Sequence, residues 1–258
     1  MKKHTYYIIF LFLGCISGFT CNRKTPEPVI QPAPAGILKL EIETDFNGSK
    51  LVMNSGNYTN ANGDPFSVST LKYYISNVTL KNSEGSLYKV PDSYYLIDVL
   101  VSNDTTINIL NIPTGTYTEI GFSLGVDSIN NHSGSQPAAL NPTIAGDMFW
   151  LWSGGYKFME LEGHSASSSS GTILFHIASD VNYKKWLMNS TTSNWTNIYI
   201  KDNASSKIIL KANIDEMFKT PTTISFTTTN SVSGGTDAQT IANNYADMFQ
   251  LSAVVNTP

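Results

Sequence analysis

Apolar and polar residues alternate along much of the chain from Ile37 onward. Residues 37–43 read Ile-Leu-Lys-Leu-Glu-Ile-Glu, so charged and apolar side chains occupy alternate positions. Successive side chains of a β-strand point to opposite faces of a sheet, and this pattern therefore predicts a strand with one buried face. The same reasoning predicts further strands over residues 71–81, 87–90, 94–100, 106–110, 117–125, 155–162, 172–177, 198–201 and 207–212.

Helices and long loops are predicted at only a few places. Residues 180–188, which begin with an aspartate suited to an N-cap, predict a helix, and residues 214–219 predict one or two helical turns before a proline. Residues 128–147 and 164–171 contain no predicted strand, and they predict long loops. The polar tail, residues 222–258, predicts a last strand and a terminal helix.

Turn sequences separate the predicted strands, notably Asn-Gly-Asp-Pro at 62–65 and Pro-Thr-Gly at 113–115. Hydrophobic residues make up 41% of the chain, enough for a sizeable core. Many short strands joined at turns are typical of a sandwich or barrel. We predict an all-β fold, a single β-sandwich-like domain of mostly antiparallel strands with long loops and one or two short helices.

The first twenty residues predict a secretory signal. A basic start, Met1-Lys2-Lys3-His4, precedes an apolar run over residues 6–19 that ends in small residues and cysteine. A transmembrane helix needs about 20 apolar residues, and this run is shorter and is followed by Asn-Arg-Lys at 22–24. We therefore predict that residues 1–20 are a cleaved leader.

The chain has 2 cysteines, Cys15 and Cys21, and both lie at this end of the sequence. A cysteine that closes a signal segment is typical of a bacterial lipoprotein. Gly14 is the better small residue before a lipidated cysteine and favours Cys15, whereas the leader length favours Cys21, which we prefer. The alternative is that both are small apolar residues of a discarded peptide.

The cysteine positions also define the predicted organisation of the chain. Residues 21–36 are rich in proline and predict an extended tether, and residues 37–258 predict the β domain. The predicted location is the cell envelope, with the protein lipid-anchored to the outer membrane and facing the periplasm or the surface. Because the domain has no cysteine, any metal site in it must use imidazole, carboxylate or a modified ring.

Charge and motif content exclude several functions. The chain carries 16 basic and 20 acidic residues, a net charge of −4, without a long basic cluster, which argues against a nucleic-acid partner. There is no glycine-rich phosphate loop. There is also no Gly-x-Ser-x-Gly motif and no cysteine nucleophile in the domain, so we predict that the protein is not an enzyme.

A few residues remain as candidates for chemistry. Glu160 and Glu162 lie two apart on a predicted strand and therefore on one face, where they suit acid–base chemistry, although we expect a solvated face. His176 lies between Phe175 and Ile177, so its side chain points away from theirs. Its alternatives are a hydrogen-bonded structural histidine and a metal ligand.

Six sequence blocks occur in a fixed order along the domain, at residues 71–77, 95–98, 112–117, 120–128, 148–163 and 175–177. The most specific are Asp127-Ser128 and the motif Phe-Trp-x-Trp-x-x-Gly-Tyr at 149–156. In this order they resemble the MbnP-like family, which is named after a methanobactin-associated copper-binding protein. The resemblance spans most of residues 37 to 218.

The resemblance implies an exported β protein. In some members of the family, two histidines and a tryptophan oxidised to kynurenine bind copper, and a separate dihaem peroxidase-like partner oxidises the tryptophan. His176 matches the later of these histidines. The earlier one is expected in the first strand, where this chain has Asp45, and a carboxylate is a poor ligand for Cu(I).

Two loop histidines, His132 and His164, are candidates to replace the missing ligand. The candidates for the oxidised tryptophan are Trp150 and Trp152. Two functions therefore remain open from the sequence. One is a copper-binding lipoprotein, and the other is a non-catalytic binding or structural module of the envelope that has lost the metal site.

Overall fold

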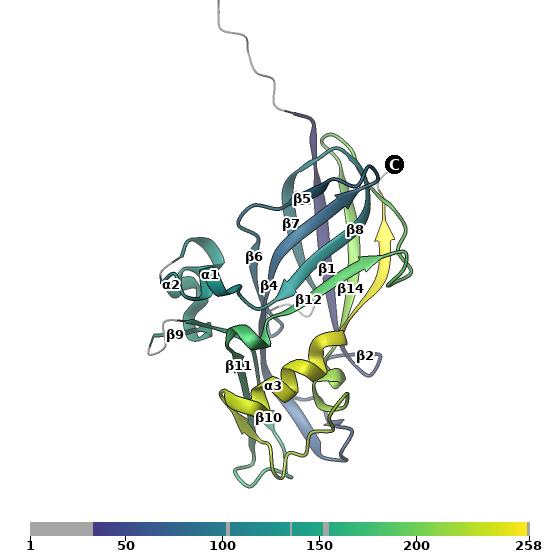
Figure 1. Cartoon of the computed structure of the whole chain (residues 1–258). Coiled ribbons are helices and arrows are strands. Elements are labelled where there is room, and N and C mark those ends of the chain that lie inside the picture. Colours follow the sequence, from purple (N-terminus) through teal and green to yellow (C-terminus); the bar gives the residue numbers. More distant parts are fainter. Residues whose placement is uncertain (1–32, 102–103, 135, 152–154, 257–258) are drawn as a thin grey trace, which may run out of the picture. The chain divides into compact units, whose positions relative to one another are not determined.

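The computed structural model describes residues 33–101, 104–134, 136–151 and 155–256 (Figure 1). The predicted leader, both cysteines and most of the predicted tether lie outside the described residues, as does Trp152. The folded unit comprises residues 33–258. Its first strand begins at Ala35, two residues before the predicted start of the β domain at Ile37.

The first sheet is organised around β1 (Ala35–Phe46). This strand pairs antiparallel with β7 (Asp104–Pro113) and parallel with β14 (Ser205–Asn213). The sheet is completed by β2 (Ser49–Lys50) beside β1 and β16 (Phe249–Val255) beside β14. The alternation predicted for β1 is confirmed, because Leu38, Leu40 and Ile42 are fully buried while the charged side chains between them are partly exposed.

The second sheet is organised around β4 (Pro65–Asn82), the longest described strand. Its central order is β12-β8-β4-β10-β11-β15, and antiparallel pairs predominate, with β11 and β15 parallel. The other strands of this order are β8 (Gly115–Leu124), β10 (Gly155–His164), β11 (Thr172–Ala178), β12 (Lys184–Asn189) and β15 (Ser231–Val232). Smaller strands extend it: β3 (Tyr58–Thr59), β5 (Leu87–Lys89), β6 (Tyr94–Asp98), β9 (Phe149–Trp150) and β13 (Ile198–Ile200).

The two sheets enclose one apolar core, which confirms the predicted all-β fold. Phe122 of β8 stacks on Trp186 of β12, and both rings pack edge-on against Phe249 of the first sheet. At the other end, Phe175 of β11 packs against Phe218, which lies in the turn that follows β14. Aromatic rings therefore tie the sheets together at both ends.

Helices are short and lie in the connections. The predicted loop over residues 128–147 contains α1 (Ser128–Asn131), η1 (Ala138–Leu140), α2 (Pro142–Ala145) and the start of η2 (Gly146–Met148). The helical turn expected over 214–219 is confirmed as η4 (Ile214–Phe218). The tail adds α3 (Gly235–Asn244), η5 (Tyr245–Asp247) and β16, so its helix precedes its strand (Figure 1). No helix in the described ranges is long and apolar enough to cross a membrane.

The prediction of a helix over 180–188 is wrong. Only residues 180–182 are helical, in η3 (Asp180–Asn182), and the rest is strand β12. Trp186 and Met188 are buried, whereas Lys185 and Leu187 are exposed, which is the alternation of a strand. Pairing with β8 decides the conformation, because the tertiary contacts of Trp186 outweigh the weak helical preference of the segment.

Candidate metal centre

The centre lies where β4, β10 and β11 run side by side in the second sheet. In the antiparallel register, Glu160 of β10 is paired with Lys72 of β4 on one side and with His176 of β11 on the other. Glu162, two residues further along β10, is on the same face. Side chains paired across strands in this way have Cβ atoms about 5 Å apart. The register therefore brings one imidazole and two carboxylates together.

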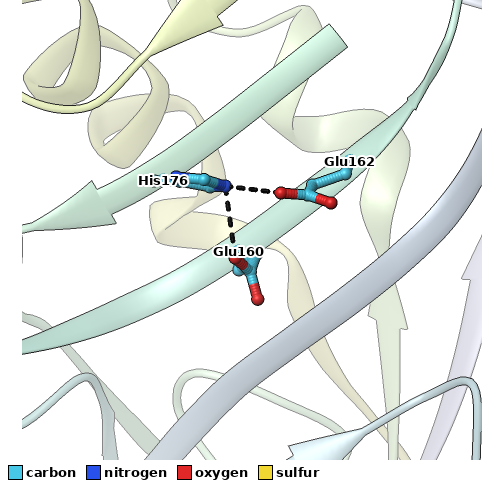
Figure 2. A group of neighbouring side chains, drawn as sticks. All are labelled: Glu160, Glu162 and His176. Carbon is cyan, nitrogen blue, oxygen red and sulfur yellow. Dashed lines mark hydrogen bonds and ion pairs between the residues drawn. The ribbon is translucent and has the colours of Figure 1, made fainter. Parts of the chain in front are cut away.

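Figure 2 shows one ring nitrogen of His176 pointing toward both carboxylates. Nε2 of His176 lies 2.8 Å from Oε1 of Glu162 and 3.2 Å from Oε1 of Glu160. Taking one ligand atom from each residue, all three lie within 4.8 Å of one another. This is the one group of at least three histidine, cysteine or acidic ligands that converges in this way within the described ranges.

The two carboxylates differ in their surroundings. Glu160 is 1% exposed, and its Oε2 has no hydrogen-bond partner within the described structure. The side chain of Glu162 is 31% exposed, and its Oε2 lies 3.5 Å from Oγ1 of Thr70, which donates a long hydrogen bond. The expectation that both glutamates form a solvated face is wrong for Glu160, whereas their common face is confirmed.

A lysine from the same strand also contacts the site. A β-bulge between Lys157 and Met159 places two residues of β10 opposite one residue of β11. Without it, residues 157 and 160 would be on opposite faces of the strand, because side chains alternate. The bulge brings Lys157 to the face of Glu160, and Nζ of Lys157 donates a hydrogen bond to Oε1 of Glu160.

Further charges surround this pair. Nζ of Lys72 lies 3.0 Å from both carboxylate oxygens of Asp147, in η2, and 4.0 Å from Oε2 of Glu160. Burial raises the pKa of Glu160, an effect that Lys157 opposes without cancelling. Burial would also raise the pKa of Asp147, but the hydrogen bond and charge of Lys72, together with the charge of Lys157 and a hydrogen bond with Glu160, outweigh it and the pKa is lowered. Ion pairs thus link two carboxylates, those of Asp147 and Glu160, to two lysines.

The comparisons with known proteins agree with the order of blocks seen in the sequence. A sequence model of the MbnP family matches residues 35–237. This chain belongs to the MbnP family. Among solved structures, it is similar to MbnP from Methylosinus trichosporium, at 14% sequence identity and a TM-score of 0.47, over 78% of this chain and 81% of that one. No curated protein sequence matches the chain.

In this MbnP-family chain, Trp150 lies beside the centre. Its indole ring is tilted relative to the imidazole of His176, with 6.5 Å between ring centroids. It also lines a cavity of about 410 Å³ together with His132. Of the two tryptophans expected from the family resemblance, Trp150 is therefore close to His176, and Trp152 is outside the described residues.

The remaining predicted ligands lie apart from the group of three. His132, just after α1, is exposed and pairs with Asp180, with 3.2 Å between Nε2 and Oδ2. His164 ends β10 at a separate cavity of about 270 Å³. Asp45, near the end of β1, is buried, with Lys211 beside it in a cavity of about 210 Å³. Burial raises the pKa of Asp45.

The sequence pattern pointed to His176 as a candidate metal ligand, and to Glu160 and Glu162 as a carboxylate pair suited to acid–base chemistry and not as ligands. His176 was a candidate because of its polar position between apolar neighbours, and the two glutamates because of their spacing. Lys157 and Lys72 were missed as neighbours of the site. Lys72 alternates with apolar residues on its strand like a solvent-facing lysine, and no sequence signal marks the bulge at residue 158.

The donor set fits a divalent cation. One imidazole nitrogen and two carboxylate oxygens are ligands suited to Cu(II) or Zn(II), whereas Cu(I) prefers soft sulfur and nitrogen ligands. Oε2 of Glu160, which accepts no hydrogen bond within the described residues, is a further acceptor in the same place. The residues present thus fit copper in its divalent state better than in its monovalent state.

Proposed function

We propose that this member of the MbnP family binds one copper(II) ion through His176, Glu162 and Glu160. The observation that carries the proposal is the convergence of the three ligand atoms within 4.8 Å of one another. Two negative charges next to an imidazole nitrogen attract a divalent cation, and the buried position of Glu160 strengthens that attraction. The proposed role is binding and not catalysis, since the domain has neither a cysteine nor a serine nucleophile motif.

The proposal includes the location of the protein. The leader over residues 1–20 and a lipid on Cys21, with Cys15 as the alternative, would hold the domain at the cell envelope through the tether. An exported domain without thiols cannot bind copper through thiolate, and the donors of the proposed site are nitrogen and oxygen. The intact mass of the protein purified from its own membranes tests this. It should correspond to an acylated chain that begins at Cys21, and an unmodified chain that retains residue 1 would contradict it.

Trp150 is the proposed site of oxidation by a dihaem peroxidase-like partner. Its ring centroid lies 6.5 Å from that of His176, so the aromatic amine of a kynurenine at this position would arise next to the metal ligands. Conversion of tryptophan to kynurenine replaces one carbon atom with one oxygen atom in the side-chain formula. Peptide mass spectrometry of the native protein should find this change at Trp150, and an unmodified Trp150 would remove kynurenine from the proposed site.

Titration with Cu(II) tests the metal site directly. The wild type is expected to bind one equivalent, and His176→Ala should weaken binding by tenfold or more because the nitrogen ligand is lost. The matched control is His132→Ala, which removes an exposed imidazole that is not part of the group. Equal and weak binding by the wild type and His176→Ala would instead support the second function, an envelope binding or structural module without a metal site.

A further inference from the structure

Lys157 already occupies part of the space that the proposed copper ion needs. Its Nζ contacts Oε1 of Glu160, the same oxygen that lies 3.2 Å from Nε2 of His176. The side chains of Lys157 and Glu160 are 6% and 2% exposed, so water does not replace either partner easily. We propose that Lys157 is the resident cation of this site and that a divalent metal ion binds by displacing its ammonium group from Glu160. This inference rests on the proposed metal-binding function.

A β-bulge in β10 places Lys157 in this position. The bulge between Lys157 and Met159 turns the lysine onto the face that carries Glu160 and His176. Bulges recur next to functional sites because they redirect a single side chain without disturbing the rest of the strand. Phe158, the extra residue of the bulge, is a core residue and is fully buried. The core thus holds the bulge, and the bulge directs the lysine.

The charges explain why displacement favours a divalent ion. Lys72 pairs with Asp147 and Glu160, and Lys157 pairs with Glu160. His176 contacts both Glu160 and Glu162. Two positive and three negative charges leave one negative charge when the imidazole is neutral. If the ammonium moves away, two negative charges remain, and one divalent ion balances them. A monovalent ion would only replace the positive charge of the ammonium group, and the site would keep one negative charge.

Lys157 therefore competes with the metal ion for Glu160. An ammonium group and a metal ion cannot both contact Oε1 of Glu160 closely, because like charges at such distances repel strongly in a buried site. The lysine lowers the affinity of the site for every metal ion. The cost of moving the ammonium away is the same for every ion, but a divalent ion balances both negative charges that remain, whereas a monovalent ion balances only one. The site is thus selective for doubly charged cations before ligand softness is considered.

The test compares the affinity for Zn²⁺ and for Cu²⁺, each added as the metal alone, in the wild type and in Lys157→Met. Methionine keeps the length of the side chain and removes its charge, so we expect binding at least tenfold tighter in the variant. Lys157→Arg keeps the positive charge and should bind as weakly as the wild type or more weakly. Lys207→Met is the matched control, since Lys207 pairs with Glu41 outside the site, with 2.6 Å between the charged atoms.

A second readout does not depend on the affinity of the wild type. Without metal, Lys157→Met should have a lower melting temperature than the wild type, and Zn²⁺ should raise its melting temperature by more than it raises that of the wild type. Lys157→Gln, which keeps a hydrogen-bond donor for Glu160, replaces the methionine variant if that one does not fold.

The outcomes separate the two proposals. If the wild type binds through His176 but removing the charge of Lys157 leaves the affinity unchanged, the role of Lys157 is refuted and the metal site stands. If His176→Ala changes the binding of neither the wild type nor Lys157→Met, the metal site itself is refuted. Tighter binding in Lys157→Met that is lost again in Lys157→Met/His176→Ala supports both.

Discussion

Replacing Lys157 with methionine without any metal present measures how much the buried ion pair contributes to stability. The change removes the hydrogen bond to Oε1 of Glu160 and leaves a carboxylate that is 1% exposed. Breaking a buried pair by removing one partner costs about 3–5 kcal/mol, because the remaining charge is uncompensated. Lys72 is still 4.0 Å from Oε2 and His176 3.2 Å from Oε1, so we expect the lower end, about 3 kcal/mol.

The expected loss is large enough to measure by thermal unfolding. For a domain of this size, 1 kcal/mol corresponds to about 2–4 °C in melting temperature, so Lys157→Met should melt about 6–12 °C below the wild type. Calorimetry of metal-free protein, in the presence of a chelator, gives this value. Lys207→Met should lose less than about 1 kcal/mol, because its side chain is 35% exposed and exposed pairs contribute little.

A double-mutant cycle identifies the cause. Lys157→Met/Glu160→Gln removes both charges, so we expect it to recover most of the stability lost in Lys157→Met, with a coupling of about 2–3 kcal/mol. If Lys157→Met lost no more than Lys207→Met, or if the double variant were as unstable as the sum of the single ones, the lysine would be held by packing alone. The reasoning from an uncompensated buried carboxylate would then be wrong.

Two further predictions concern other parts of the domain. Burial would raise the pKa of Asp127, but hydrogen bonds from Tyr94, Asn77 and Asn130 outweigh it, and the pKa lies below the usual 3.8. The contribution of the Asp127 carboxylate to stability is therefore full above that value and is lost as the pH falls below it. Asp127→Asn should flatten the acid limb of a plot of unfolding free energy against pH. An unchanged acid limb would contradict this. Gly163→Ala should destabilise the domain by about 2 kcal/mol or more in denaturant unfolding, because the new Cβ would lie 1.9 Å from the backbone oxygen of Ser67. The control is Gly171→Ala, whose Cβ meets no atom within 4 Å and which should show only the strain of its positive φ.

The sequence by itself determined the elements that have a clear periodicity. Alternation predicted β1, most of β4 and β10, and the outward position of His176 on β11, because the face of a strand follows directly from the parity of the residue number. It also placed both glutamates on one face. The leader, the lipidated cysteine and the tether stay predictions, because they lie outside the described residues.

The tertiary structure alone decided the site. The partners of Glu160 come from three strands, and Lys72 is 88 residues and His176 16 residues away in the chain, so only the strand order and register bring them together. The burial of Glu160 depends on the ion pair with Lys157, and that pair depends on one extra residue in a strand. A bulge changes which side chains share a face without changing the composition around it. Periodicity therefore singled out His176 and the two glutamates, whereas register, bulge and burial decided that they meet and what surrounds them.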